Sequence, residues 1–338
     1  MKVGKVGIHV DERAMTRPAK RITSIDVARA AGVSQTTVSF VLNDKPGHSI
    51  PEATRLRILE VARELDYRPH ASARALAAGR SDIVLLSVPD LPIGGAISRF
   101  IEEMASALAD QGLTLVTYLA GAHGRPLADV CATVNASVVI GLIPFADDTV
   151  QALYRAGADV VLPSRSSHAD AGRPVGRIQA EHLIARGHRR IGYAMPGHPG
   201  LLEMAQDRLE GAVEACAEAG LEPPVVLSTS LEIPAAAAAV GQWRSQSVTG
   251  VCAFNDETAI AVLAGLRDQG LTAPADLAVI GVDDIATARL AAPPLTTVSF
   301  DLRQAGRGRA EAVMAGLAGR EPHLSTGQHW KLIERVSA

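Results

Sequence analysis

Near the beginning of the chain, apolar residues recur at the spacing of an amphipathic helix, in two short groups. The two groups within residues 23–43 are Val27, Ala28 and Ala31, then Val38, Val41 and Leu42. Gly32 separates them, and glycine readily ends a helix in a left-handed conformation. Thr23 and Asp26 have the spacing of a capping-box pair, and Ser34 can cap the second group. The pattern predicts two short helices joined by a tight turn.

The other positions of the second helix fall on its opposite face, where they are open to solvent or to a partner. They are Gln35, Thr36, Ser39 and Phe40. A short helix pair with such a face is typical of a DNA-binding helix-turn-helix, whose second helix carries side chains into a major groove. The alternative is a buried corner between two helices, which many helical proteins contain.

Two further helical segments follow this pair. Pro51 fits the start of a third helix over 52–65, and apolar residues of that helix can close a small three-helix core: Leu56, Leu59, Val61, Ala62 and Leu65. The segment 70–78 is rich in alanine and spans about two turns, which is too short for a stable isolated helix. Leu76, between Arg74 and Arg80, is the kind of side chain that wedges into a minor groove.

From Asp82 onward, short apolar runs alternate with amphipathic segments that end at a glycine. The strand-like runs are Ile83–Val88, 113–118, 138–143, 159–162, 190–194, 224–227, Gly250–Ala253 and 277–282, and the helical segments are 97–111, 150–156, 179–186, 207–219 and 256–269. Such alternation predicts an α/β domain with a parallel sheet, and nearly all-apolar strands indicate helices on both faces. The length allows one large domain or two similar lobes.

Charge is distributed unevenly along the 338 residues. Residues 1–80 hold 14 Lys and Arg against 8 Asp and Glu, a net charge of +6, which leaves −9 of the total −3 for residues 81–338. A basic head on an acidic body favours phosphate binding at one end of the molecule.

The sequence gives little support to a membrane, metal or redox protein. No apolar run reaches the roughly 18 residues that span a membrane, and the N-terminus lacks the apolar core of a signal peptide, so we expect a cytoplasmic protein. Cys131, Cys216 and Cys252 lie far apart in apolar surroundings, which predicts buried free thiols. The 10 histidines show no metal-site spacing, and no metal or cofactor is expected.

Two other functional classes remain as alternatives. A solute-binding protein of the same fold would need a signal peptide and no basic head, and the sequence fails both expectations. An enzyme could use the adjacent carboxylates of Asp283 and Asp284, but a turn at a strand end splays neighbouring side chains apart. No set of nucleophile, base and orienting group is visible, so the sequence disfavours an enzyme.

Taken together, these motifs resemble the lac-repressor (LacI/GalR) family of bacterial transcription regulators. Matching segments keep the family's order from residue 22: DVARAAGVSQTTVSFVLN (26–43), IPEATR (50–55), LDYRPHASARALAAGRS (65–81), AEHLIARGHRRIGY (180–193), RLEGAVEACAEAGL (208–221), FNDETAIAVLAGLRDQGL (254–271), AVIGVDDI (278–285) and PPLTTVSFD (293–301). The resemblance implies a helix-turn-helix DNA-binding domain over 21–68, a hinge helix over 69–81 and a two-lobed periplasmic-binding-protein-like (type I) core over 82–338. Residues 1–20 carry no periodic pattern and are expected to be a disordered tail.

The resemblance implies a homodimeric repressor of metabolic genes that binds a pseudopalindromic operator in double-stranded DNA. By the family pattern Gln35 and Thr36 read bases, whereas Phe40 stands where a polar reader is common and can only pack or touch a thymine methyl. Leu76 of the hinge would kink the central base step, and His70 replaces a common Asn. The implied DNA-binding residues are Thr23, Ser34, Gln35, Thr36, Thr37, Ser39, Phe40, Asn43, Thr54, Tyr67, Ala73 and Leu76.

The resemblance also implies a small-molecule effector, a sugar or another metabolite, in a cleft of the core. The matching positions are Asp90, Arg208, Asn255, Asp283 and Phe300. Most follow strand ends, where ligands bind in open α/β sheets. The chain departs from the family at 172–173, where Gly-Arg replaces an Asp-Asn pair, and at 92–95, where Pro-Ile-Gly-Gly replaces an aromatic pair. Because of these departures, and because only 3% of residues are aromatic, we expect a pocket that is smaller, differently filled or unused.

Overall fold

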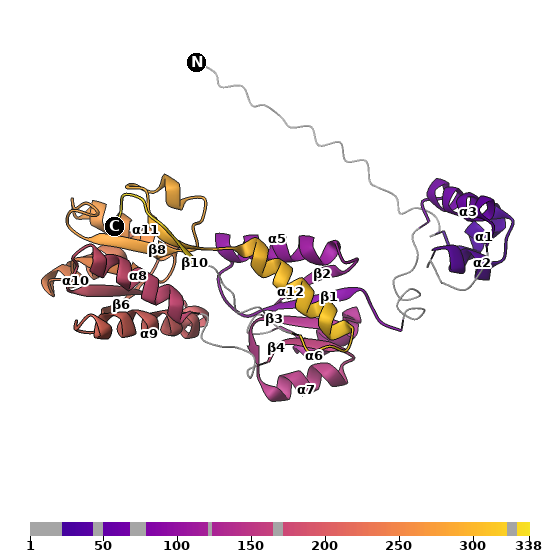
Figure 1. The fold of residues 1–338 in the computed structure, drawn as a ribbon, viewed down its shortest axis with the longest axis horizontal. Helices are drawn as coiled ribbons and strands as arrows, with labels where there is room; N and C mark the ends of the chain where they lie inside the picture. Colours follow the sequence, from indigo (N-terminus) through magenta and orange to yellow (C-terminus); the bar gives the residue numbers. More distant parts are fainter. Residues whose placement is uncertain (1–21, 43–49, 68–78, 121–123, 165–171, 323–329) are drawn as a thin grey trace, which may run out of the picture. The chain divides into compact units, whose positions relative to one another are not determined.

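The computed structural model describes residues 22–42, 50–67, 79–120, 124–164, 172–322 and 330–338. The chain divides into two compact units, Met1–Ser81 and Asp82–Ala338 (Figure 1). The tail expected over 1–20 and nearly all of the hinge helix expected over 69–81 lie outside the described residues.

The first unit contains the predicted pair of short helices and a third helix. Their bounds are Ser24–Ala31 (α1), Gln35–Leu42 (α2) and Glu52–Glu64 (α3). Gly32 ends α1 in the left-handed conformation, with φ of 66°, as the sequence predicts. The shared core consists of Val27, Ala28, Ala31, Val38, Val41, Ile58 and Ala62.

The prediction for the buried face of α3 was partly wrong. Leu56 is 58% exposed and Leu59 is 39% exposed, whereas Ile58 and Ala62 are buried. Ile58 and Ala62 are four residues apart and share one face of the helix, so Leu56, two positions earlier, falls on nearly the opposite side. Val61 and Leu65 flank the core as predicted.

The second unit has two lobes, each a sheet covered by helices on both faces. In the N-terminal lobe the parallel strand order is β2-β1-β3-β4. Its strands are Ile83–Val88 (β1), Thr114–Leu119 (β2), Val138–Phe145 (β3) and Val160–Ser164 (β4). Its helices are Gly95–Ala109 (α5), Leu127–Val134 (α6), Asp147–Arg155 (α7) and Leu302–Leu317 (α12). Helices α5 and α12 pack on one face and α6 and α7 on the other.

The C-terminal lobe has the strand order β10-β9-β8-β7-β5-β6. Its strands are Ile191–Pro196 (β5), Val225–Thr229 (β6), Gly250–Ala253 (β7), Ala278–Val282 (β8), Thr296–Phe300 (β9) and Trp330–Ile333 (β10). Its helices are Arg173–Ala185 (α8), Leu202–Glu218 (α9), Ile233–Ser245 (α10) and Asp256–Asp268 (α11), with short 3₁₀ turns at Pro199–Leu201 and Ala288–Leu290. The strands pair in parallel, as predicted, except the edge strand β10, which runs antiparallel to β9.

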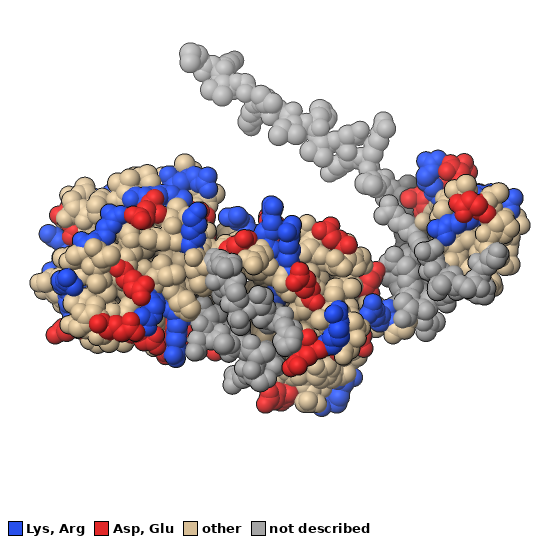
Figure 2. All heavy atoms as spheres, viewed as in Figure 1, with Lys and Arg blue, Asp and Glu red and all other residues tan. Residues whose placement is uncertain are grey.

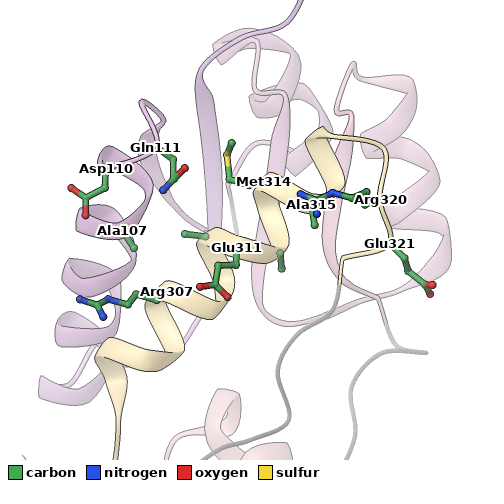
Figure 3. Close-up of a pocket in the computed structure, with 11 residues that line it drawn as sticks. Ala107, Asp110, Gln111, Arg307, Glu311, Met314, Ala315, Arg320 and Glu321 are labelled. Carbon is green, nitrogen blue, oxygen red and sulfur yellow. The ribbon is translucent and has the colours of Figure 1, made fainter.

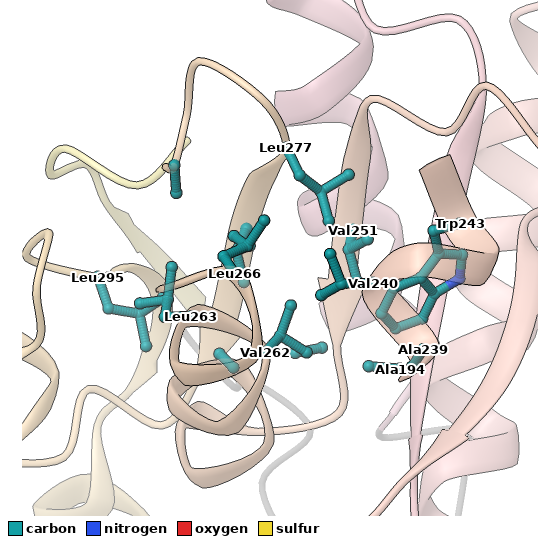
Figure 4. Packing of buried hydrophobic residues seen from close by; sticks show 14 of the residues in the cluster. Ala194, Ala239, Val240, Trp243, Val251, Val262, Leu263, Leu266, Leu277 and Leu295 are labelled. Atoms are coloured by element: carbon teal, nitrogen blue, oxygen red, sulfur yellow. The ribbon is translucent and has the colours of Figure 1, made fainter. Parts of the chain in front are cut away.

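Each face of the C-terminal sheet carries its own apolar core. Figure 4 shows the core under α10 and α11, where Trp243 packs with Val240, Val251 and Val262. The indole nitrogen of Trp243 donates to the carbonyl oxygen of Val225 at 2.9 Å, so this buried polar atom is satisfied.

Helices α8 and α9 cover the other face and approach each other closely at two glycines. A Cβ added to Gly176 would lie 1.6 Å from the carbonyl oxygen of Arg208, and one added to Gly211 would lie 1.9 Å from that of Arg173. Only glycine fits at these crossings. This close packing of α8 against α9 fixes the distance between the backbone of Arg208 and the sheet.

The remaining sequence predictions concern cysteines and membranes. Cys131, Cys216 and Cys252 are buried and free, which confirms the prediction. Within the described ranges, no helix is both long enough and apolar enough to cross a membrane.

Candidate functional site

The start of α1 contains the predicted capping box. The backbone nitrogen of Thr23 donates to Oδ2 of Asp26 at 2.9 Å, and the backbone nitrogen of Asp26 donates to Oγ1 of Thr23 at 3.4 Å. At the start of α2, the backbone nitrogen of Thr37 donates to Oγ of Ser34 at 3.1 Å. These bonds satisfy amide groups that a helix start leaves open, and so define both helix starts of the pair.

The first turn of α2 presents the predicted base-reading side chains. Gln35 and Thr36 are exposed, and Thr37, Ser39 and Phe40 are partly exposed. Nε2 of Gln35 donates to Oγ of Ser24 at 3.0 Å, which orients the amide across the turn between the helices. Such an amide can read adenine edges in a major groove.

The other predicted DNA-binding residues are spread around this unit or lie outside it. Thr23 and Ser34 are exposed, and Thr54 and Tyr67 are half-buried on and after α3. Asn43, Ala73 and Leu76 lie outside the described residues.

The second unit contains a cavity of about 670 Å³ that both lobes line. Four of the five residues predicted for an effector site line it: Arg208, Asn255, Asp283 and Phe300. Asp90 is exposed in the loop after β1 and is not among the described lining residues. This cavity, called the cleft below, lies at the carboxyl ends of the parallel strands, where ligands bind in open α/β sheets.

Arg208 is the central charged group of the cleft. It is only 8% exposed, because α9 places it between the sheet and Phe254. Its Nη1 donates to the carbonyl oxygen of Phe254, and its Cζ lies 4.6 Å from the centre of the Phe254 ring. Its Nη2 lies 3.8 Å from Oδ1 of Asp283. The guanidinium is therefore held in one orientation by three contacts.

The adjacent aspartates after β8 diverge, as the sequence predicts. Asp283 and Asp284 have positive φ values of 106° and 47°. Asp283 lies toward Arg208, whereas Oδ1 of Asp284 accepts from Nη2 of Arg335 at 2.6 Å. Burial raises the pKa of Asp283, while the charge of Arg208 acts in the opposite direction.

Asn255 caps the start of α11 and Asp256 is its first residue, and their side chains make different contacts. Oδ1 of Asn255 caps the helix by accepting from the backbone nitrogen of Thr258 at 2.9 Å. Asp256 is fully buried behind the cleft, where its carboxylate accepts from Oγ1 of Thr297 at 2.6 Å and from the backbone nitrogen of Ile285 at 2.9 Å. Burial raises the pKa of Asp256 to about 8, although both hydrogen bonds act to lower it.

Several residues of the cleft were missed by sequence reasoning. Trp330 on β10 pairs in register with Phe300, and their ring centres lie 4.7 Å apart. Thr229, the last residue of β6, and His198, in the loop after β5, also line the cavity. Ile93 lines it as well, from the segment 92–95 that departs from the family's aromatic pair. Thr229 and His198 follow parallel strands and could have been found by the rule that predicted Asp283. Trp330 could not, because its strand was not predicted.

A second cavity lies in the N-terminal lobe between α5 and α12 (Figure 3). Its volume is about 830 Å³, and Arg307, Glu311, Arg320 and Glu321 contribute charges of both signs. It contains none of the residues predicted from the sequence. Among the described residues, no group of three or more His, Cys, Asp and Glu side chains could hold a metal ion.

The fold and the site define the class: a helix-turn-helix protein with a two-lobed, periplasmic-binding-protein-like core. Residues 24–70 match bacterial regulatory proteins of the lacI family, and residues 180–338 match the periplasmic binding protein-like domain. The chain is 31% identical over 313 residues to the HTH-type transcriptional regulator GalR of Escherichia coli (strain K12), covering 88% of this chain and 89% of that protein. The chain therefore belongs to the lacI family and is a DNA-binding transcriptional regulator.

Further relatives agree with this assignment. The HTH-type transcriptional repressor PurR of Vibrio cholerae serotype O1 (strain M66-2) is 29% identical over 327 residues, covering 92% of this chain and 96% of that protein. The Lac repressor dimer bound to operator and the anti-inducer ONPF shares the fold, with a TM-score of 0.76 at 23% identity over 94% of this chain and 99% of that chain. These relatives are transcriptional regulators and not enzymes.

Proposed function

We propose that the protein is a cytoplasmic repressor of metabolic genes that binds a pseudopalindromic operator as a homodimer and is controlled by a small molecule in the cleft. In this proposal residues 21–68 bind DNA, residues 69–81 form a hinge helix, and residues 82–338 bind the effector and dimerise. The main support for the proposal is the first turn of α2. The start of this helix is capped by Ser34, and Gln35 and Thr36 are exposed to solvent there.

Several features support a regulated repressor. The cleft is large enough for a metabolite, since ligand pockets typically measure about 300–1,000 Å³. Because both lobes line it, a ligand that favours one lobe arrangement would shift the population of core states. Among relatives, PurR is a repressor, and the Lac repressor has been solved as a dimer bound to an operator and an anti-inducer.

Selection of genomic DNA on the purified protein tests the proposal. Fragments of the source genome would be captured at moderate salt and sequenced. A repeated motif with two inverted half-sites is the expected result, because a dimer places two recognition helices about one helical turn apart. Enrichment of one asymmetric half-site, or no enrichment, would contradict the dimeric reader.

The same operator then serves to test control by a small molecule. Metabolites would be added to the protein–operator complex, and operator affinity would be measured by fluorescence anisotropy. A compound that changes operator affinity while leaving non-specific binding unchanged supports regulation through the cleft. That compound should lose its effect when Arg208 is replaced by Met.

A further inference from the structure

The second helix of the helix-turn-helix pair, α2, carries no charged side chain. Its eight residues read QTTVSFVL, and neither an acidic nor a basic group lies in its first or last turn. Val38 and Val41 are buried in the three-helix core, and Leu42 packs against that core. The side chains that α2 can bring to a base pair are therefore one amide, three hydroxyls and one aromatic ring.

This set of groups on α2 matches adenine and thymine better than guanine and cytosine. In the major groove, guanine is read mainly by an arginine or a lysine, and cytosine donates to a carboxylate. Adenine pairs with an amide, and thymine presents a methyl group that apolar side chains contact. Because α2 has an amide and apolar groups but neither a cation nor a carboxylate, its chemistry selects A·T base pairs.

The amide of Gln35 is held in an orientation that suits adenine. One N–H of its Nε2 donates to Oγ of Ser24 at 3.0 Å. The other N–H and Oε1 are left to pair with a base, and adenine offers N7 as the acceptor and its N6 amino group as the donor. The contact with α1 therefore fixes the amide and keeps the two groups that adenine needs.

Thr36 and Phe40 supply the apolar part of the outer face of α2. They are four residues apart, so their side chains are neighbours on one row of the helix. Thr36 is exposed and Phe40 is partly exposed, and Phe40 belongs neither to the core nor to the described side chains that pack against it. Their positions differ by about 6 Å along the helix axis, compared with about 3.4 Å per base step. They can therefore contact methyl groups one or two base steps apart.

Attraction to phosphates comes from other helices of the same unit. Arg29 on α1 and Arg57 on α3 are exposed cations. Such groups bind the DNA backbone without regard to sequence, and their contribution falls as salt rises. Because α2 has no charge, base selection by α2 and salt-dependent affinity arise from different side chains.

We propose that α2 reads A·T base pairs through the 5-methyl group of thymine, with Gln35 on an adenine and with Thr36 and Phe40 on thymine methyls. Operator affinity then depends on the methyl group at carbon 5 of pyrimidines in each half-site. 5-Methylcytosine carries the same methyl group and partly replaces thymine there. This inference rests on the proposed function in taking α2 as the recognition helix.

Selection from randomised duplexes by the full-length protein identifies the half-site without assuming its sequence. Each selected half-site should contain at least two fixed A·T pairs within a few base steps of each other, because the amide and the apolar side chains lie on one short helix. A half-site whose fixed positions are mainly G·C pairs would overturn the proposal.

Replacement of thymine by uracil tests the methyl contact directly, since uracil lacks only the methyl group. Each thymine of one half-site is replaced in turn, and affinity is measured by fluorescence anisotropy. At one or two positions binding should weaken about fourfold, the effect of withdrawing one methyl-sized group from apolar contact. The dependence of affinity on salt should stay the same, because no phosphate contact is lost. Unchanged binding with uracil at every thymine would overturn the proposal.

The converse experiment adds a methyl group to cytosine. At a position where uracil weakens binding, the T·A pair is replaced by a C·G pair that carries either cytosine or 5-methylcytosine. The methylated duplex should bind about fourfold tighter than the unmethylated duplex, because the methyl group returns to the same apolar side chain. Equal affinity of the two duplexes would contradict the methyl contact.

Variants of α2 assign each methyl contact to a side chain. Thr36→Ser removes one methyl group from an exposed residue and should abolish the difference between thymine and uracil at one position. Phe40→Ala should abolish it at another position. The control is Leu56→Ala on α3, since Leu56 is an apolar side chain of the same unit and is 58% exposed. Circular dichroism checks the fold, and if Phe40→Ala does not fold, Thr36→Ser decides. Sensitivity to uracil that survives in the folded variants would contradict these roles.

Two outcomes distinguish this inference from the proposed function. If the protein selects two inverted half-sites but tolerates uracil at every thymine, the dimeric repressor stands and the methyl readout fails. If the protein selects a single asymmetric site and loses affinity with uracil as described, the methyl readout stands and the dimeric repressor fails.

Discussion

At the scale of single residues, Arg208 shows how a charge is kept inside the core. Its guanidinium is buried, and the stabilising contacts come from two parts of the C-terminal lobe: the carbonyl and the ring of Phe254 after β7, and Asp283 after β8. A buried cation without such contacts would be strongly unfavourable. The contacts leave Nε without a partner in the described chain, and that atom lies in a residue that lines the cleft.

Asp256 gives the core a dependence on pH whose direction can be worked out. Burial raises the pKa of Asp256 to about 8, from 3.8 for an unperturbed aspartate. Between these values the folded chain holds one proton more at this site than the unfolded chain. Its contribution to the free energy of unfolding therefore falls as pH rises from about 4 to 8.

Replacing Asp256 by Asn should remove this contribution. Urea denaturation at several values between pH 5 and pH 8 would show a smaller fall in stability for Asp256→Asn than for the parent chain. Asp268→Asn, which removes an exposed carboxylate from the end of the same helix, is the control. Equal pH dependence in the parent and in Asp256→Asn would mean that Asp256 is ionised in the folded state throughout this range.

Gln35 is the side chain on which base recognition should depend most. Changing it to Ala should reduce discrimination between the operator and an altered site by about 1–3 kcal/mol, because a bidentate amide contact to a base is lost. Binding to unrelated DNA should change little, since that binding comes from phosphate contacts. Anisotropy titrations with both DNAs measure the two effects. Gln246→Ala, the same substitution on the surface of the core, is the control, and an unchanged operator preference would remove Gln35 from the base-reading set.

At the scale of elements, α8 and α9 position the cleft through their glycine crossings. A Cβ at position 176 would overlap the backbone of Arg208, so Gly176→Ala should destabilise the core by about 3 kcal/mol or more and displace Arg208. Gly308→Ala in α12 is the matched control, because nothing lies within 4 Å of the added carbon. That change should stabilise the protein by about 0.5–1 kcal/mol. Guanidinium denaturation compares the two, and a parent-like stability for Gly176→Ala would contradict the close packing.

Strands and helices were predictable where hydrophobic periodicity and glycine stops agreed. The strand Ile83–Val88 and the helix that ends near Gly270 were found for this reason. Helix α10 was missed because its alanine run has no contrast between a buried and an exposed face in the sequence. The segment of β10 is short, and its partner β9 is remote in the chain, so its pairing depends on tertiary contacts.

The same limits apply to the candidate site. Arg208, Asn255, Asp283 and Phe300 were predicted together from family resemblance and strand-end positions, and the structure places all four around one cavity. The apolar character of that cavity was not predictable, because Leu231 and Trp330 come from segments with no signal for a common site, and the segment 92–95, which contains Ile93, was noted only as lacking the family's aromatic pair. Their convergence is a property of the lobe arrangement within the second unit.

At the scale of the whole molecule, the two units carry net charges of opposite sign and so differ in their long-range attraction to DNA. On the face seen in Figure 2, acidic and basic side chains are interspersed over the second unit, with no broad basic surface. Residues 82–338 carry a net charge of −9, and residues 1–81 carry +6. Long-range attraction to DNA phosphates must therefore come from the first unit.

The isolated fragment 82–338 should therefore fold and yet fail to bind DNA, even at about 50 mM salt, where phosphate contacts are strongest. The full chain should bind unrelated DNA at that salt and lose affinity linearly on a logarithmic plot as salt rises, because each phosphate contact releases a counterion. Electrophoretic mobility shift at stepped salt concentrations measures both behaviours, and circular dichroism checks that the fragment is folded. A folded fragment that still binds DNA would show that the acidic core holds a nucleic-acid surface of its own, and the charge division between the two units would then not explain binding.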